Sequence, residues 1–362
     1  MQHPKNTSLW KIAITKFKKN KLALYSFWYI LFCGFIAVFA YVLAPDNSPN
    51  AKIQHIEIHT QRPLYKTLIF QDFSRNHTKQ AFLNKVLFGN KNYALEKPIN
   101  SFATKNDTLK LNLFSKDVKI SKQEIIPLQN HNLKYKIKEK TFLLGTDKYG
   151  RDFLSRILIG TRISFFIGFI AVFISLIIGI TIGAIAGYFG EKIDKFIMWL
   201  INVTWSIPTL LMVIAITLAL GKGFYQVFIA VGLTMWVEVA RVVRGQVIQL
   251  KQEQYIEAAK ALGYSNFRII FKHILPNILG PIIVISAANF AAAILIESGL
   301  SFLGVGAQPP TPSWGSIIKD HYNYILLGKG YLAIIPGLAI MSLVMAFMLL
   351  GNGLRDALDV KN

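Results

Sequence analysis

Two glutamates, Glu238 and Glu297, stand inside or at the end of long apolar stretches of the sequence. A carboxylate is costly within a lipid bilayer, and acids found there usually face a solute path or pair with a neighbouring group. Arg241 follows Glu238 by three residues, so the two side chains share a face if the segment is helical. Two interpretations of Glu238 therefore stay open, a place on a translocation path and a local ion pair. Glu297 is a second candidate for the path.

The remaining side chains show no pattern that supports catalysis or metal binding. The sequence lacks G-x-x-x-x-G-K-[ST], so it cannot hold ATP in a P-loop. Its seven histidines show no H-E-x-x-H or other paired spacing, and its one cysteine, Cys33, excludes a thiolate cluster and an internal disulfide. We therefore expect no catalytic residue, no metal ligand and no cofactor held by this chain.

The composition is that of an integral membrane protein. Of the 362 residues 53% are hydrophobic and only 16% are charged, with a mean hydropathy of +0.40, whereas a soluble domain carries about 25% charged residues. The net charge of +21 would suit nucleic acid. However, the basic residues form no dedicated groove-binding element and the apolar runs are far too long, so we expect membrane lipid and no nucleic acid as a partner.

Six transmembrane helices are expected. Five stretches without Lys, Arg, Asp or Glu are each 24 to 28 residues long, enough to cross the hydrocarbon core. They lie between Lys21 and Asp46, Arg162 and Glu191, Lys195 and Lys222, Lys272 and Glu297, and Lys329 and Arg355. A sixth span runs from about Phe224 to Val243, because its two charged side chains can extend to the interface. Pro208, Pro281 and Pro336 lie within spans and should kink them.

The distribution of Lys and Arg predicts the orientation. Residues 1–21 contain six Lys and no acid, and residues 241–272 contain six Lys and Arg against two Glu. Both segments are therefore expected in the cytoplasm, and with six spans both termini are cytoplasmic. A cleavable signal peptide is the alternative for the first span. Its 24-residue apolar core and the lack of an A-x-A site favour a retained helix.

A polar insertion rich in Lys and Asn separates the first two spans. Alternating apolar and polar residues predict strands over 56–58, 109–113 and 133–138, and residues 80–88 suit a short amphipathic helix. We expect a small α+β cap outside the membrane; a partly ordered spacer is the alternative. The expected organisation is a cytoplasmic N-terminus 1–21, transmembrane helix 22–45, extracytoplasmic insertion 46–143, a core 144–355 with helices 2–6, and a cytoplasmic tail 356–362.

A short helix is expected in the basic loop after the fourth span, over residues 254–263. Gly263 suits the left-handed position that ends a helix. Tyr255, Ala258, Ala259 and Leu262 recur at i, i+3, i+4 and i+7, so they share one face. The two alanines leave little bulk there, so a partner surface can approach the backbone closely. A helix lying on the lipid interface is the alternative.

The same loop resembles that of a known family. Glu257, Ala258, Ala259 and Gly263, followed by Leu275 and Pro276, match the EAA loop of binding-protein-dependent ABC importer permeases. Residues 144–152, 300–315 and 353–359 are similar to the C-type permease subunit of the dipeptide, oligopeptide and nickel branch. His273 stands where the common form has isoleucine, and the insertion of about 95 residues departs from compact members.

The resemblance implies a fold, partners and a role. The fold is the all-α ABC importer type I permease fold in the bacterial inner membrane. The EAA loop is the coupling helix that docks in a groove of the cytoplasmic ATPase. The implied partners are a second similar permease, two ATPase subunits that bind ATP and Mg²⁺, and an extracytoplasmic solute-binding protein. Peptides are the implied substrates, with nickel or another small solute as the alternative.

A channel and a structural membrane protein are the alternatives from other classes of function. A channel needs a filter of repeated carbonyls or rings of charge, and the sequence shows neither. A structural membrane protein would act through the outer insertion, which carries no recognisable chemical motif.

Overall fold

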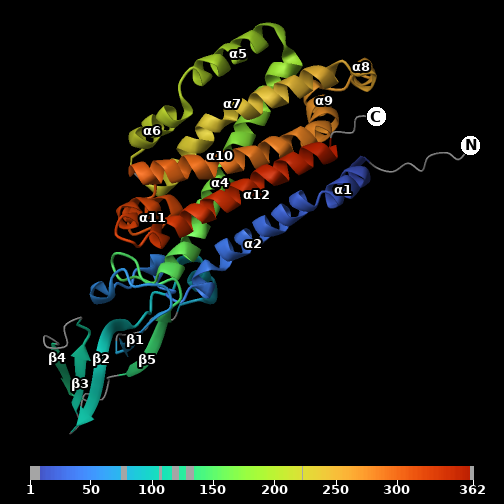
Figure 1. The fold of residues 1–362 in the computed structure, drawn as a ribbon. Helices are drawn as coiled ribbons and strands as arrows, with labels where there is room; N and C mark the ends of the chain where they lie inside the picture. Colours follow the sequence, from blue (N-terminus) through green and yellow to red (C-terminus); the bar gives the residue numbers. More distant parts are fainter. Residues whose placement is uncertain are drawn as a thin grey trace, which may run out of the picture. The chain divides into compact units, whose positions relative to one another are not determined.

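The structure is a computed structural model that describes residues 9–74, 80–105, 108–115, 122–127, 134–221 and 223–358. The chain forms two compact units. The helical unit comprises residues 1–34, 164–308 and 338–362, and the sheet unit comprises residues 35–163 and 309–337. Figure 1 shows both kinds of architecture, long helices and an antiparallel sheet.

The helical unit is built from long apolar helices. The helices with residues in it are α1 (Leu9–Lys19), α2 (Lys21–Leu43), α4 (Phe153–Phe189), α5 (Glu191–Trp205), α6 (Thr209–Ala219), α7 (Phe224–Lys251), α8 (Gln254–Ala261), α9 (Asn266–Ile269), α10 (Leu279–Leu303) and α12 (Tyr331–Leu358). Val239, Val243 and Val247 of α7 recur every four residues, so they lie on one face. They pack with Ala184 of α4 and Ile282 of α10 in a buried core.

Five helices in the described part of the chain are long and apolar enough to cross a membrane, or six if one bent pair counts as a single span. That pair is α5 and α6, which meet at an angle of 89°. The bend falls at Pro208, as the sequence predicts, whereas α10 continues through Pro281 and α12 continues through Pro336. Proline lacks the N–H that would continue the helical ladder and disfavours helical geometry in the residue before it.

Five strands and two α-helices lie wholly within the described residues of the sheet unit. They are β1 (Tyr65–Asp72), α3 (Phe82–Phe88), β2 (Leu95–Lys105), β3 (Thr108–Leu113), β4 (Gln123–Pro127), β5 (Tyr135–Phe142) and α11 (Trp314–His321). The strand order is β4-β3-β2-β1-β5 with every neighbouring pair antiparallel. The core of the sheet includes Phe70, Ile99, Leu109 and Leu111, each at most 2% exposed.

The insertion is therefore a folded α+β unit over its described residues. The helix expected over 80–88 corresponds to α3, and the strands expected over 109–113 and 133–138 correspond to β3 and β5, although Leu133 lies outside the described residues. The strand expected over 56–58 is wrong. Residues Ile56–Ile58 form a 3₁₀ turn in which the N–H of Ile58 donates to the carbonyl of His55. Three alternating residues are too few to establish a strand against such local bonds.

Residues 144–152 form a tight connector within the sheet unit. The carboxylate of Asp147 accepts hydrogen bonds from the Arg151 backbone N–H at 2.9 Å and from its Nε at 2.6 Å, and both side chains are buried. The Nζ of Lys148 lies 3.0 Å from the carboxylate of Asp320 in α11. The connector thus joins the last strand of the sheet to the segment 309–337.

Candidate coupling loop and intramembrane acids

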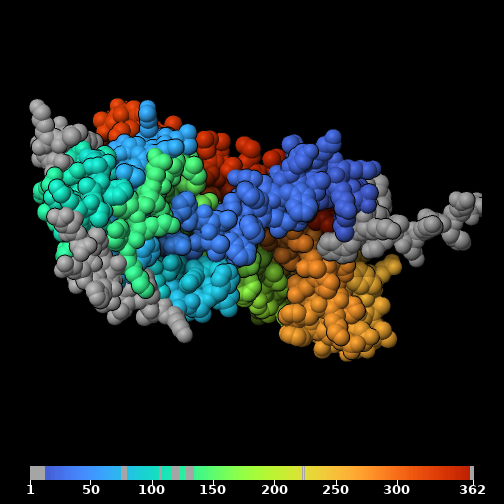
Figure 2. All heavy atoms as spheres, turned by 90° about the horizontal axis from the view of Figure 1, so that it is seen from below, coloured from blue at the N-terminus to red at the C-terminus, as the bar shows by residue number. Residues whose placement is uncertain are grey.

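The loop between α7 and α10 lies at one end of the helical unit. Figure 1 shows α8 and α9 beyond the end of α7, at the same end as α1 and the last turn of α12. Figure 2 shows the atoms of this loop, in orange, standing out from the neighbouring helices on the face in view. The loop is therefore exposed at this end of the helical unit.

Gly263 ends α8 in the predicted manner. Its φ is +76°, in the left-handed region that favours glycine. The N–H of Gly263 donates to the carbonyl of Lys260 at 2.9 Å, and the N–H of Tyr264 donates to the carbonyl of Ala259 at 3.1 Å. These two bonds form a Schellman motif, which satisfies carbonyls that the helix leaves free at its end.

The faces of α8 differ in part from the prediction. Tyr255, Ala258 and Leu262 are exposed, as is Glu257, whereas Ala259 is only 4% exposed and belongs to the buried core. Placing Ala259 on the open face is therefore wrong. Ile256, which is fully buried, sets the rotation of the helix about its axis, and Ala259 lies close enough to Ile256 around the axis to turn inward with it.

A tyrosine that the sequence pattern did not single out anchors the loop. Tyr188, near the end of α4, donates from its hydroxyl to Oδ1 of Asn266 at 2.8 Å. The Nζ atoms of Lys251 and Lys260 lie 5.7 and 5.8 Å from the centre of the Tyr188 ring, within the range of cation–π attraction. No spacing in the sequence links residue 188 to residue 266, so only the structure reveals this contact.

Leu275 and Pro276 lie where the loop enters α10. Residues Ile270–Ile274 form a wide π-helical turn, and residues Leu275–Ile278 form a tight 3₁₀ turn. Leu275 packs against the same core as Ile256, while Pro276 is exposed. The family motif thus combines residues that fix the loop with residues that stay on its surface.

Glu297 lies inside the helix packing. Its side chain is fully buried, Oε1 accepts a hydrogen bond from Oγ of Ser301 at 2.6 Å, and Oε2 lies 3.4 Å from Oγ of Ser164 in α4. Oγ of Ser301 also accepts from the N–H of Ala307. The acid therefore connects α4 to α10 and to the segment after α10.

Glu238 has a different environment. It is exposed on α7 and lines a cavity of about 140 Å³ beside the bend between α5 and α6, together with Thr209 and Thr234. The guanidinium of Arg241 lies 3.6 Å from the centre of the Trp205 ring. Among the residues that the structure describes, no ion pair joins Glu238 to Arg241, so the local-pair interpretation is wrong.

Comparison with known proteins identifies the family. The family described as "Binding-protein-dependent transport system inner membrane component" matches residues 179–361, which include the whole loop between α7 and α10. The chain belongs to this family. A second model, the N-terminal TM domain of oligopeptide transport permease C, matches residues 8–61 of the permease. The resemblance inferred from Glu257 to Pro276 is thereby confirmed.

Curated relatives agree with this assignment. The permease is 45% identical over 217 residues to the dipeptide transport system permease protein DppC of Alkalihalophilus pseudofirmus, covering 60% of this chain and 71% of the relative. It is 42% identical over 218 residues to the glutathione transport system permease protein GsiD of Pectobacterium atrosepticum, covering 60% and 72%. A chain of the inward-facing MetNI methionine ABC transporter covers 56% of this chain and 95% of its own length, with 18% identity and a TM-score of 0.47.

The permease is thus a multi-pass membrane component of an ABC transport system. The ATPase of such a system is a separate subunit, and a solute-binding protein delivers the solute.

Proposed function

We propose that this permease forms, with a second similar permease, the path by which di- or oligopeptides are imported across the bacterial inner membrane. Two ATPase subunits bind ATP and Mg²⁺ in the cytoplasm, and an extracytoplasmic binding protein delivers the peptide. The observation that carries the proposal is the 45% identity to a dipeptide permease over 60% of the chain. Nickel or another small solute is the alternative cargo for the same kind of subunit.

The exposed face of α8 is the proposed docking surface for the ATPase. It presents Tyr255, Ala258 and Leu262, and the small side chain of Ala258 lets another backbone approach closely. The buried residue Ile256 and the hydrogen bond from Tyr188 to Asn266 fix α8 to the ends of the long helices. Movement of the ATPases on binding ATP would therefore move α4, α7 and α10 as a group and open the path outward, and hydrolysis would reset it.

The experiment that tests the function is reconstitution of the complete transporter in liposomes with its binding protein. Uptake of a labelled dipeptide that requires ATP is the expected result. Uptake of Ni²⁺ in place of peptide would select the alternative cargo. Solute flow without ATP would contradict an importer and indicate a channel.

The proposed orientation predicts opposite labelling of two sites. Cys33 is buried and is the single cysteine, so a Cys33→Ser chain is a clean background. Lys138→Cys in β5 should react with a membrane-impermeant maleimide in spheroplasts. Lys260→Cys in α8 should react only after the membrane is permeabilised, because residues 241–272 carry the positive charge typical of cytoplasmic loops. The reverse pattern of labelling would contradict the orientation and with it the cytoplasmic termini.

Glu238 is the proposed polar group on the translocation path. Glu238→Gln removes one charge from its cavity without changing the size of the side chain, so we expect peptide import to slow at least tenfold while basal ATP hydrolysis changes less than twofold. Glu191→Gln, an exposed acid at the start of α5, is the matched control and should import normally. Equal import by both variants would remove Glu238 from the path. Glu297, which is buried between α4 and α10, is proposed to position these helices.

A further inference from the structure

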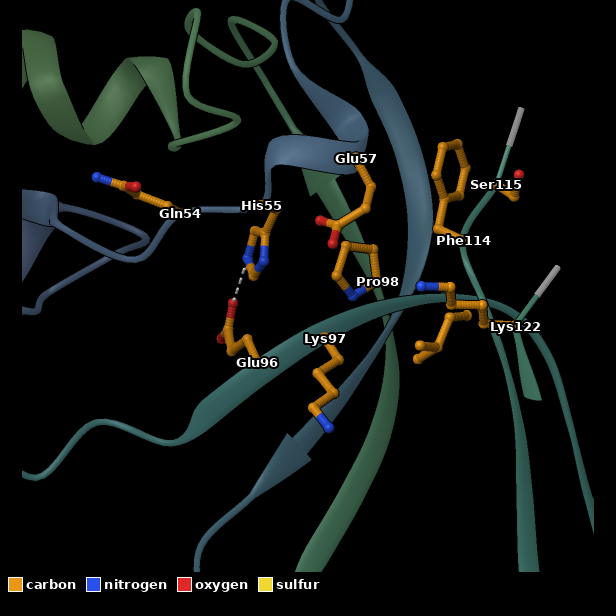
Figure 3. A pocket seen from close by; sticks show the side chains of 10 residues that line it. Gln54, His55, Glu57, Glu96, Lys97, Pro98, Phe114, Ser115 and Lys122 are labelled. Atoms are coloured by element: carbon orange, nitrogen blue, oxygen red, sulfur yellow. Dashed lines mark hydrogen bonds and ion pairs between the residues drawn. The ribbon is translucent and has the colours of Figure 1, made fainter. Parts of the chain in front are cut away.

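The sheet unit contains a cavity that has no role in the transport function proposed above. Its volume is about 400 Å³, within the range of small-molecule sites. Three segments of the chain form its walls: the turn at residues 54–57, the first half of β2, and the chain at the end of β3 and the start of β4. Figure 3 shows their side chains around this space.

One wall of the cavity is held rigidly. The Nε2 of His55 lies 3.1 Å from the carboxylate of Glu96, and its backbone N–H donates to the carbonyl of Tyr149. Gly150 lies so close to this turn that a Cβ there would be 1.7 Å from the carbonyl oxygen of His55. The turn that carries Glu57 is therefore fixed before any ligand arrives.

Several charged groups at the cavity are already occupied. Glu96 accepts from His55 and from Nζ of Lys140 at 2.9 Å. Lys97 pairs with Glu124 outside the cavity, with its Nζ 2.6 Å from one carboxylate oxygen. Glu96 and Lys97 therefore already have partners of opposite charge within the sheet unit.

Two charged groups remain, one of each sign. Glu57 and Lys122 line the cavity, are exposed, and make no ion pair with another described residue. In Figure 3 the carboxylate of Glu57 and the Nζ of Lys122 lie on opposite sides of Pro98. Pro98, which is buried, and Phe114, which is half-buried, supply apolar surface to the cavity. A complementary ligand carries an ammonium at one end, a carboxylate at the other, and an apolar group between.

We propose that this cavity is a binding site for a short zwitterionic peptide, separate from the path through the helices. The ammonium of the peptide pairs with Glu57, its carboxylate pairs with Lys122, and an apolar side chain lies against Pro98 and Phe114. This assignment of ligand rests on the proposed peptide import, which it extends with a second place on the permease where peptide is held.

The test is binding of L-alanyl-L-phenylalanine to the purified full-length chain in nanodiscs, measured by isothermal titration calorimetry. We expect one site per chain. Glu57→Gln and Lys122→Met should each weaken binding at least tenfold, because each removes one charge partner. Glu139→Gln and Lys138→Met, exposed residues of β5 outside the cavity, are the matched charge controls and should change the dissociation constant less than twofold.

Chemically blocked peptides assign the two ends. N-acetylation of the peptide should weaken binding to the wild type at least tenfold and have less than a twofold further effect on Glu57→Gln. C-terminal amidation should behave in the same way with Lys122→Met. Binding that is absent at millimolar peptide, or that is equal in the wild type and both cavity variants, would overturn the site.

Failure of the site and failure of the proposed function give different results. If reconstituted transporter imports peptide but the chain shows no binding at the cavity, the site is wrong and the import function stands. If the cavity binds peptide but the wild-type transporter imports none, the import proposal fails and the site remains.

Discussion

Replacing Ala258 by glutamate should lower the rate of ATP-driven import at least a hundredfold, while the protein still inserts and folds. Ala258 lies on the exposed face of α8 between Tyr255 and Leu262, where a partner surface must come close to the backbone. A longer, charged side chain would hold that surface away and would bury an unpaired charge if contact formed. Uptake in proteoliposomes measures import, and co-purification with the ATPase measures docking; we expect both to be lost together.

Two neighbouring variants make the test specific. Ala258→Ser keeps the small size of the side chain and should import normally. Ala259→Glu places a carboxylate in the core, where the native side chain is 4% exposed, so it should lower the yield of folded protein rather than only block docking. Normal import by a well-folded Ala258→Glu chain would contradict the assignment of α8 as the coupling helix.

Glu96→Gln should destabilise the sheet unit strongly at neutral pH. Burial alone would raise the pKa of Glu96, but hydrogen bonds from His55, Lys140 and Gln71 and the charge of Lys140 lower it from 4.5 to about 2. A shift of this size is linked to about 3 kcal/mol of folding free energy. Because the pKa is lowered in the folded state, this contribution is complete above pH 4.5 and is lost as the pH falls toward 2.

Protease digestion measures this effect, because cleavage follows the opening of the folded unit. At pH 7.5, trypsin should cut residues 65–142 of the Glu96→Gln chain at least tenfold faster than the wild type. Pepsin near pH 2.5 should show a much smaller difference. Glu124→Gln is the control: its pair with Lys97 is exposed, so it should change the rate less than twofold. Equal rates for Glu96→Gln and the wild type at pH 7.5 would show that the buried network is not a source of stability.

The features that one local pattern determines were predictable from the sequence. Apolar runs gave the long helices because burial in lipid demands about 20 such residues in succession. Gly263 was recognisable as a helix end because a left-handed residue is needed there. Alternation over 109–113 was long enough to predict β3, since one face of that strand supplies Leu109 and Leu111 to the core.

Features that depend on contacts between distant segments were not predictable. The inward rotation of Ala259 follows from the core that receives Ile256. The spacing along α7 favours Arg241 as the partner of Glu238. In the structure the guanidinium of Arg241 instead lies over the ring of Trp205, the last residue of α5 before the 89° bend into α6.

The cavity in the sheet unit also depends on contacts between distant segments, so the sequence does not predict it. Glu57 and Lys122 are 65 positions apart in the sequence, and neither belongs to a recognisable motif. Their common cavity arises because the turn at residues 54–57 packs beside β2, while β3 and β4 follow β2 in the sheet.

The two outer strands of the sheet, β4 and β5, determine whether copies of this permease can associate edge to edge when they are crowded in a membrane. A strand with one unpaired edge can add a strand from a neighbouring molecule, which leads to aggregation. On β5 the exposed side chains include Lys136 and Lys138, whose repulsion opposes such pairing, and β4 is only five residues long and ends at Pro127, which has no N–H to donate. Part of the net charge of +21 thus keeps adjacent copies of the sheet from joining edge to edge.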